Sequence, residues 1–327
     1  MSSIIQEDPD AQHVAFGATG AYGYAVAKKL LEKRFNVRAV VRNEEKANKM
    51  FPKGVEIVKA DMLNGEEVSN ACKGASAIYL GNNFPYRKWK ANFMLSLSNI
   101  LKGSKGTKPL IVFPGNVYGY GKFQRVPVDE SHPFNASSRK GKLRNTMEAL
   151  LMDYHRKGEI RVVIPRFADF YGPNVVNDLY GRIFRSAIDG KPAIWPANAD
   201  VSHNLTYIED AAEATILLML NSNSYGTSYH VSGDVITASE FIKGVYGAAG
   251  SRMELKVLSK TFLAVAGLFN SNARELIELL YEYSDPYILD DSKFMAEFPS
   301  FKHTPYDVGI RETIDWFKAN ASIMKNI

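Results

Sequence analysis

The stretch HVAFGATGAYGYAVAKKLLEKRFNVRAVVRN, residues 13–43, most constrains what this chain can fold into. An apolar strand leads into a glycine-rich turn, an amphipathic helix follows, and a second apolar strand ends at Arg42. Gly17, Gly20 and Gly23 are spaced three residues apart where the strand gives way to the helix. Glycine lets the backbone turn sharply and lets a phosphate approach without meeting a Cβ atom. The order of elements predicts a dinucleotide site; a tight turn without a ligand is the alternative.

The helix predicted to begin near Ala21 directs unpaired N–H groups and the positive end of its dipole toward a pyrophosphate in the turn. The other candidate contacts follow the ends of predicted strands, where an α/β sheet binds its ligands. The candidate cofactor-binding residues of this kind are Gly17, Thr19, Gly20, Ala21, Tyr22, Gly23, Arg42, Asp61, Met62, Gly81, Asn82 and Phe167.

The end of the second strand indicates which dinucleotide is bound. NAD binders commonly place an acidic residue there for the ribose 2′-hydroxyl, but this strand ends in VVRN at residues 40–43. The guanidinium of Arg42 would pair with a 2′-phosphate, and Lys46 is close enough in sequence to help. The sequence therefore favours NADP(H) over NAD(H), the alternative being that Arg42 is a solvated strand-end residue. Asp61 is expected to accept from the adenine amino group or else to cap a helix, and Gly81 would let the chain pass close to the pyrophosphate.

Strands and helices alternate through the first two thirds of the chain. Strands are predicted at 13–16, 37–41, 55–60, 76–81, 109–115, 161–167 and 204–208, and helices at 22–34, 44–50, 65–73, 88–101 and 142–155. Near-continuous apolar strands are typical of a parallel sheet covered on both faces. The pattern predicts an α/β fold, a Rossmann-type doubly wound parallel sheet with a smaller, mostly helical C-terminal substrate part. We expect residues 12–174 with 204–236 to bind the dinucleotide and 175–203 with 237–327 to cover the substrate.

Composition excludes several other classes. The net charge is +5 without a dense Lys/Arg block, so nucleic acid is not a predicted partner. No apolar run reaches the length of about 18 residues that spans a bilayer, and the apolar stretch 260–269 is expected to pack in a core or lid, with membrane contact as the alternative. A single cysteine and a polar, acidic start predict a reducing, cytoplasmic location and a short mobile tail. No metal site is predicted.

The motifs FGATGAYG, FPGNVYG, PRFADFYGP and NLTYIEDAAEA, together with Asp61 followed by Met62, resemble the extended short-chain dehydrogenase/reductase family. This family includes sugar-nucleotide epimerases and dehydratases, and the resemblance runs from about residue 13 to residue 317. It implies a two-domain enzyme with the cofactor on the sheet and a small-molecule substrate in the cleft. It also implies a homodimer paired through the helices at 88–101 and 142–155, the alternative being that the apolar faces of these helices pack on the sheet.

The resemblance further implies a catalytic Ser, Tyr and Lys, and here the sequence departs from the family. Lys142 fits the lysine that holds the nicotinamide ribose, although a surface lysine is the alternative. The tyrosine position falls on Ser138, a much weaker acid, and the serine position falls on Pro114, which has no donor. Tyr118, in the loop after the fifth strand, is the best remaining proton donor, and Asn116 would polarise a carbonyl. The candidate catalytic residues are therefore Lys142, Tyr118, Ser138 and Asn116.

Two further departures concern the substrate. Sugar-nucleotide enzymes of this family often hold the diphosphate with an Asn and an Arg, which here fall on Asp169 and near His203. A carboxylate repels a diphosphate, and a mostly neutral imidazole holds one only weakly. The alternative is that Asp169 is structural and is held by nearby backbone N–H groups. The leading hypothesis is an NADP(H)-dependent oxidoreductase that transfers a hydride to or from a small carbonyl or hydroxyl compound. A sugar-nucleotide epimerase or dehydratase and a non-catalytic NADPH-binding sensor remain as alternatives.

Overall fold

The computed structural model describes residues 10–176, 179–269, 274–275 and 277–321. The chain divides into two compact units, each discontinuous in sequence. The first consists of Met1–Gly119, Lys140–Arg166 and Ala211–Tyr229, and the second of Tyr120–Arg139, Phe167–Asp210 and His230–Ile327. The boundaries expected from the sequence divide the chain by function rather than by contact, and they stay a prediction. Most of the expected N-terminal tail lies outside the described residues.

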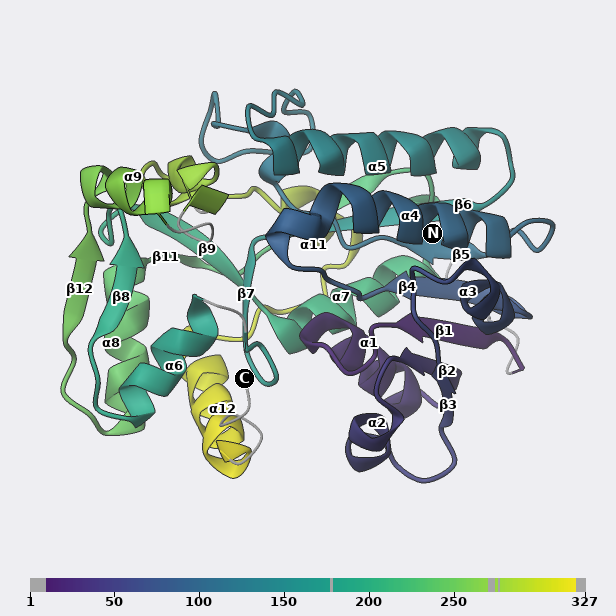
Figure 1. Cartoon of the computed structure of the whole chain (residues 1–327), viewed down its shortest axis with the longest axis horizontal. Helices are drawn as coiled ribbons and strands as arrows, with labels where there is room; N and C mark the ends of the chain where they lie inside the picture. The colour runs from purple at the N-terminus through teal and green to yellow at the C-terminus, as the bar shows by residue number, and fades with distance from the viewer. Residues whose placement is uncertain (1–9, 177–178, 270–273, 276, 322–327) are drawn as a thin grey trace. The chain divides into compact units, whose positions relative to one another are not determined.

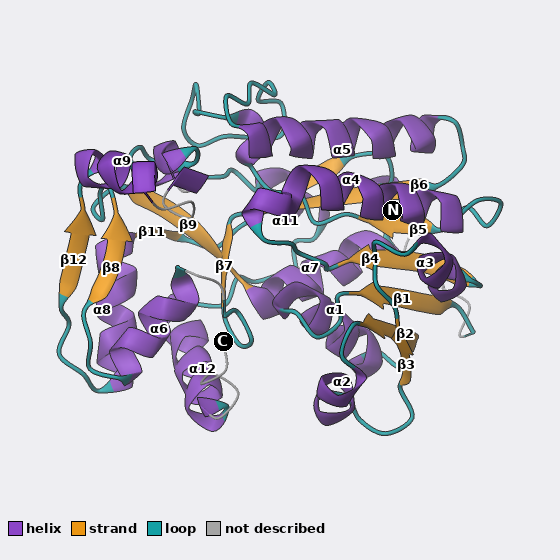
Figure 2. Ribbon diagram, viewed as in Figure 1, coloured by secondary structure: helices purple, strands orange, loops and turns teal. Residues whose placement is uncertain are grey.

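The first unit is built on a seven-stranded sheet with the order β10-β6-β5-β4-β1-β2-β3 (Figures 1 and 2). Neighbouring strands from β1 to β6 run parallel, and the middle of β1 is fully buried, as both faces of the sheet are covered. The predicted Rossmann-type α/β fold is confirmed. The strands are β1 (Gln12–Phe16), β2 (Asn36–Val41), β3 (Glu56–Lys59), β4 (Ala75–Leu80), β5 (Leu110–Val112), β6 (Arg161–Phe167) and β10 (Ser228–Val231).

The helices of the first unit pack in two groups. In one group the Tyr22 hydroxyl of α1 shares a hydrogen bond of 2.8 Å with Thr215 of α7. In the other group α3 packs against α4, where Cys72 is buried beside Gly103. The elements are α1 (Ala21–Glu32), α2 (Glu44–Met50), α3 (Gly65–Cys72), α4 (Trp89–Gly103), α5 (Arg139–Arg156), α7 (Ile208–Leu220) and the short helices η1 (Tyr86–Lys88), η2 (Tyr118–Tyr120) and η3 (Ser222–Ser224). The five helices predicted from the sequence are all present.

The strand order of the large sheet reverses between β1 and β4. Phe16, the last residue of β1, is in register with Leu80, the last residue of β4. Open α/β sheets bind ligands just beyond the carboxyl ends of the strands at such a reversal. Gly17 and Gly81, the next residues of the two strands, therefore mark where the first unit is expected to bind.

The second unit combines two small sheets with helices. β9 pairs parallel with β7 and antiparallel with β11, and β8 pairs parallel with β12. Trp195, Phe184 and Phe241 lie at the centre of its core. Of these strands the sequence predicted only β9, because strands of three or four residues are too short to show a period of two. The elements are β7 (Asp169–Tyr171), β8 (Ala193–Pro196), β9 (Ser202–Tyr207), β11 (Val235–Thr237), β12 (Leu255–Leu258), α6 (Tyr180–Ile188), α8 (Ala238–Ala249), α9 (Lys260–Phe269), η4 (Leu280–Tyr283), α11 (Ser292–Glu297) and α12 (Tyr306–Ala319).

Helix α9 corrects one expectation from the sequence. Of its side chains that the structure describes, Leu263 is buried, whereas Phe262, Leu268 and Phe269 are 58%, 69% and 87% exposed. The prediction that this apolar stretch packs in a core is therefore wrong for most of its described side chains, and a role as a lid stays a prediction. Within the described part of the chain, no helix combines the length and the apolarity that crossing a membrane requires.

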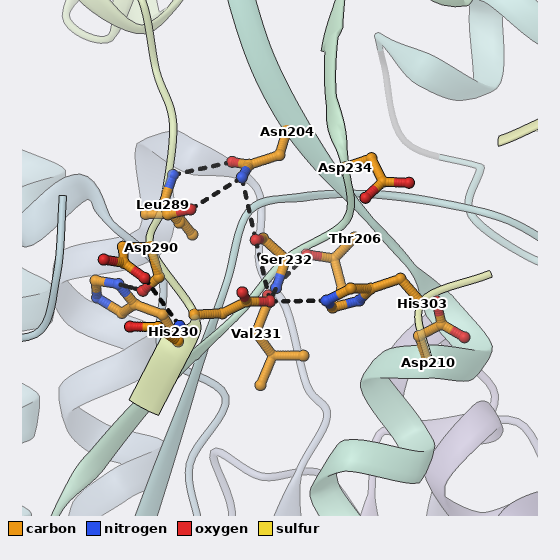
Figure 3. A network of polar contacts seen from close by, with 12 residues as sticks. Asn204, Thr206, Asp210, His230, Val231, Ser232, Asp234, Leu289, Asp290 and His303 are labelled. Atoms are coloured by element: carbon orange, nitrogen blue, oxygen red, sulfur yellow. Dashed lines mark hydrogen bonds and ion pairs between the residues drawn. The ribbon is translucent and has the colours of Figure 1, made fainter. Parts of the chain in front are cut away.

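A polar network fastens the C-terminal segment of the second unit (Figure 3). Asn204 of β9 donates to Ser232 and to the Leu289 carbonyl, and it accepts from the Leu289 N–H, all at 3.1 Å. His303 Nε2 lies 2.9 Å from a carboxylate oxygen of Asp291, and Asp210 accepts from both the N–H and the hydroxyl of Thr304. Four segments distant in sequence are thereby joined through side chains.

We predict that Gly23→Ala destabilises the protein by about 1–3 kcal/mol, because the new methyl group would meet backbone atoms that cannot yield. Its Cβ would lie 2.5 Å from the Gly17 carbonyl oxygen. Urea unfolding measures the change. Gly247→Ala in α8 is the control: its Cβ would meet nothing within 4 Å, and alanine favours a helix, so this variant should be as stable as the wild type or more stable. Equal stability of Gly23→Ala and the wild type would contradict the prediction.

We predict that His303→Gln costs more stability at pH 6 than at pH 9. Burial opposes the imidazolium, but Asp291, with Asp210 and Asp234, outweighs it and raises the pKa of His303 above its ordinary value. A raised pKa in the folded state stabilises the protein below the unfolded pKa of about 6.5, and this contribution is lost as the pH rises through the folded value. The difference in unfolding free energy between variant and wild type should be about 2 kcal/mol at pH 6 and smaller at pH 9. A loss independent of pH would contradict it.

Candidate functional site

Three glycines bring the ends of β1 and β4 and the start of α1 into backbone contact. A Cβ atom on Gly23 would lie 2.5 Å from the Gly17 carbonyl oxygen, and one on Gly81 would lie 2.6 Å from Gly23 Cα. Gly17 has a φ of +66°, in the left-handed region that favours glycine. Since no side chain fits between these segments, the turn presents bare backbone to whatever binds over it.

Helix α1 begins with its first amides uncapped by a side chain. Its N-cap residue is Gly20, and its first turn contains no acidic residue. By contrast, Asn43 caps α2 and Asn64 caps α3. A Cβ on the exposed Gly20 would come no nearer than 3.3 Å to another residue, so the packing of the turn does not demand glycine there as strictly. Open amides at the positive end of a helix dipole fit a pyrophosphate.

Polar groups around this turn also suit a dinucleotide. Arg42 is exposed beyond the end of β2, and its side chain forms no hydrogen bond or ion pair within the described part of the chain. Lys46 Nζ donates to the Thr19 carbonyl at 3.3 Å, and burial lowers its pKa. The side-chain nitrogen of Asn82, next to Gly81, is buried without a hydrogen-bond partner among the described residues. An unpaired buried donor beside a bare turn is consistent with a bound ligand.

Asp61 and Met62 follow β3, as the sequence predicted. The Asp61 carboxylate accepts from the Leu63 N–H at 3.0 Å, and the exposed side chain caps no helix. The alternative that Asp61 is a helix N-cap is wrong, because Asn64 accepts from the first amides of α3. Met62 is buried, and its carbonyl accepts from Asn99 of α4. The adenine contact predicted for Asp61 stays a prediction.

Two predicted cofactor residues are buried by their own packing. The Tyr22 hydroxyl is hydrogen-bonded to Thr215, and burial raises its pKa, so a cofactor role would fall to its backbone N–H. Phe167 lies in the second unit, 2% exposed, with its ring centroid 5.3 Å from that of Phe170. The structure thus gives both side chains a packing role, and their cofactor contacts stay predictions.

Helix α5 turns two cations inward and one outward. Lys142 is exposed, and its side chain contacts no charged group among the described residues. Lys140 and Arg144, one helical turn apart, are 3% and 6% exposed. Lys140 Nζ lies 4.7 Å from the ring centroid of Tyr86, in the loop that begins at Gly81. Neither residue was predicted as a site residue from the sequence, although their spacing of four, with Leu143 and Met147 on the same side, indicates a common buried face.

The loop after β5 carries two of the predicted catalytic residues. Asn116 accepts from the Tyr118 N–H at 3.3 Å, and the Tyr118 ring stacks on Trp89 with centroids 6.2 Å apart. Pro114 stands where the family has serine, and its carbonyl accepts from Arg144 Nη2. Asn145 donates to the Gly119 carbonyl at 3.0 Å. Two side chains of α5 therefore fasten this loop on either side of Tyr118.

Ser138 lies in the second unit. It is buried beside the Tyr281 hydroxyl, whose pKa is raised by burial. The next residue, Arg139, donates from its backbone N–H to the carboxylate of Glu278. Ser138 thus lies next to Tyr281 within the second unit, and its catalytic role stays a prediction.

The two substrate-related departures also lie in the second unit. Burial raises the pKa of Asp169 to about 6, and the Tyr180 hydroxyl donates to its carboxylate at 3.4 Å. Tyr283 supplies a second hydroxyl, so side chains rather than the suggested backbone N–H groups hold Asp169. Burial lowers the pKa of His203 to about 4, which leaves it neutral at pH 7. Among the described residues, no three His, Cys, Asp or Glu side chains are placed to hold a metal ion.

A sequence model of the NAD dependent epimerase/dehydratase family matches residues 14–232. The chain belongs to this family. The resemblance to extended short-chain dehydrogenases/reductases is confirmed, and the family is one of NAD-dependent enzymes, which supports a nicotinamide dinucleotide cofactor. The finer preference for NADP(H) stays a prediction.

Curated relatives match this family member over limited lengths. The UDP-N-acetyl-alpha-D-glucosaminuronate decarboxylase of Bacillus cytotoxicus is 24% identical over 234 residues, 67% of each chain. The NmrA-like family domain-containing oxidoreductase FrzB of a Cladobotryum species is 36% identical over 77 residues, 23% of each chain. The match thus spans between about a quarter and two thirds of these two relatives.

Solved structures share the fold over nearly the whole chain. The UDP-glucose 4-epimerase of Thermus thermophilus, in complex with NAD, has a TM-score of 0.76 and 20% identity, covering 94% of this chain and 99% of that one. The epimerase Mth375 of Methanothermobacter thermautotrophicus has a TM-score of 0.81 and 15% identity, covering 98% and 95%. Both likenesses show the fold and leave the substrate open.

We predict that Lys140, rather than Lys142, supports cofactor binding from α5, because only Lys140 lies on the inner face of that helix. Lys140→Met should raise the Kd for NADPH by about 10-fold, whereas Lys142→Met should leave it within about twofold. Fluorescence titration of the two matched variants measures this. A loss confined to Lys142→Met would restore the assignment made from the sequence.

Proposed function

We propose that the protein is an NADP(H)-dependent oxidoreductase that interconverts a small carbonyl compound and its alcohol by hydride transfer. The observation that carries the proposal is the pair of cations beside the glycine turn. Arg42 is exposed and unpaired within the described residues, and Lys46 is held against Thr19 of the turn itself. A cation at the end of the second strand, where NAD binders carry an acid, suits a 2′-phosphate.

Residues of the first unit also provide the other contacts that we propose for the cofactor. The nicotinamide cofactor, when bound, supplies the hydride. The turn at Gly17 and Gly20 offers backbone amides to the pyrophosphate, and Asn82 offers a buried donor that lacks a partner within the described residues. Lys140 would hold the cofactor from α5, beside the loop that follows β4. The protein thus orients the cofactor and supplies a path for the proton.

The proposed substrate is small and carries no nucleoside diphosphate. Asp169 is a half-buried carboxyl whose neighbours are tyrosine hydroxyls, and His203 is neutral at pH 7. Neither side chain offers the fixed positive charge that a diphosphate needs. The location in the cytoplasm and the homodimer through α4 and α5 stay predictions.

Two other functions each have an observation in their favour. Relatives named as a UDP-N-acetyl-alpha-D-glucosaminuronate decarboxylase and a dTDP-glucose 4,6-dehydratase favour a sugar-nucleotide substrate. Pro114 and Ser138, in place of the family's serine and tyrosine, favour a sensor that binds NADPH without turnover. Nucleoside diphosphate binding in the micromolar range would support the first. NADPH binding without oxidation by any aldehyde, ketone or enone would support the second.

We predict that Arg42→Ala raises the Kd for NADPH by about 10-fold and leaves the Kd for NADH within about twofold, since only NADPH carries the 2′-phosphate. Calorimetric titration of both cofactors measures the difference. Lys49→Ala, which removes another exposed positive charge, one that is paired with Glu45 of the same helix, is the control and should change neither value. Wild-type protein that prefers NADH, or a variant that weakens both cofactors equally, would contradict the prediction.

A further inference from the structure

Three charged side chains are buried in the first unit, and one of them, Arg144, has no ion-pair partner among the described residues. Arg166 Nη2 lies 2.5 Å from a carboxylate oxygen of Glu148, with both side chains at most 6% exposed, and Arg166 also donates to Ser228 at 2.8 Å. Arg144, on the same face of α5 as Glu148, is the third member and is 6% exposed. Glu148 is thus paired with Arg166, whereas Arg144 forms no ion pair within the described part of the chain.

The other contacts of Arg144 do not neutralise its positive charge. Its Nη2 donates to the neutral Pro114 carbonyl, and its guanidinium lies 4.2 Å from the ring centroid of Phe113. Its Nε is buried without a hydrogen-bond partner among the described residues. Burial lowers the pKa of Arg144 to about 10, and Glu148 only partly opposes this. A buried charge short of partners is costly, and it favours the formation of negative charge nearby.

Tyr118 is the titratable group placed to take up that charge. Like Glu148 and Arg166, it interacts electrostatically with Arg144. Its position is fixed, because α5 holds the loop at Pro114 through Arg144 and at Gly119 through Asn145. Stacking on Trp89 and the bond from its N–H to Asn116 fix it further.

We propose that Tyr118 is the proton donor of the reaction and that Arg144 stabilises the phenolate it leaves. The proposal rests on the proposed function. In the direction of reduction, with the cofactor bound, the carbonyl carbon would accept the hydride that the cofactor supplies, and the carbonyl oxygen would accept the proton from Tyr118 Oη. A C–H and an O–H bond would form, the substrate would be reduced to the alcohol and the dihydronicotinamide would be oxidised. Tyr118 would become a phenolate, stabilised electrostatically by the Arg144 guanidinium, and would regain its proton from water.

The pairing differs from that of a tyrosine and a lysine on one helix. Here the hydroxyl comes from the loop after β5 and the cation from α5, and Arg144 and Asn145 of that helix hold the loop before and after Tyr118. Lys140, one turn earlier on α5, is the other cation on this face.

The test is the alkaline titration of Tyr118, followed by the ultraviolet absorbance of phenolate in the protein without cofactor. Subtracting the curve of Tyr118→Phe from that of the wild type isolates this residue. We expect a midpoint at or below the ordinary value of about 10 despite burial, and a rise of about one pH unit or more in Arg144→Met. Arg144→Lys, which keeps the charge, should return the midpoint toward that of the wild type.

Several outcomes would overturn the proposal. A wild-type midpoint well above that of a free tyrosine would do so even if Arg144→Met failed to fold, as would a midpoint that Arg144→Met leaves unchanged. Activity gives the second readout: Tyr118→Phe should lower kcat by about 100-fold with the Kd for NADPH unchanged. A Tyr118→Phe enzyme with full kcat would remove Tyr118 as donor. If the wild type bound no nicotinamide cofactor, the proposed function would fail whatever the titration showed.

Discussion

The first unit depends on a contact made without side chains. Gly17, Gly23 and Gly81 place the ends of β1 and β4 and the first turn of α1 so close together that a single Cβ would collide with backbone. This contact sits where the strand order of the sheet reverses, which is where such sheets bind ligands. Packing and ligand binding therefore both favour glycine at these three positions. A Cβ on Gly20 would meet the Gly17 carbonyl oxygen at 3.3 Å, a less severe contact, so packing constrains this position less than the other three.

Helix α5 shows how one element divides its charges between packing and chemistry. Its outer face carries Lys142, and its inner face carries Lys140, Arg144 and Glu148. Burying several charges in one unit is expensive, and the cost is tolerated where the charges pair or where they serve a reaction. Glu148 pairs with Arg166, and Arg144 remains available to act on a neighbour.

The sequence predicted the fold well because long apolar strands and amphipathic helices carry strong periodic patterns. It predicted the turn at Gly17 to Gly23 for the same reason, since the pattern is local. On α5 the motif spacing selects Lys142 and the buried helical face selects Lys140, and which of the two holds the cofactor stays a prediction. Contacts such as that of Arg144 with Pro114 join residues thirty positions apart and leave no local trace. The short strands of the second unit, β7 and β8 among them, were missed because they extend over too few residues to show a pattern.

The packing of α3 against α4 has a consequence for handling this protein. Cys72, the single cysteine of the chain, is buried there beside Gly103, and burial raises the pKa of its thiol to about 12. Reagents for thiols attack the thiolate, which is scarce at neutral pH in such a place. Labelling of Cys72 therefore requires α3 and α4 to separate, so the rate of its labelling would report how often these two helices separate.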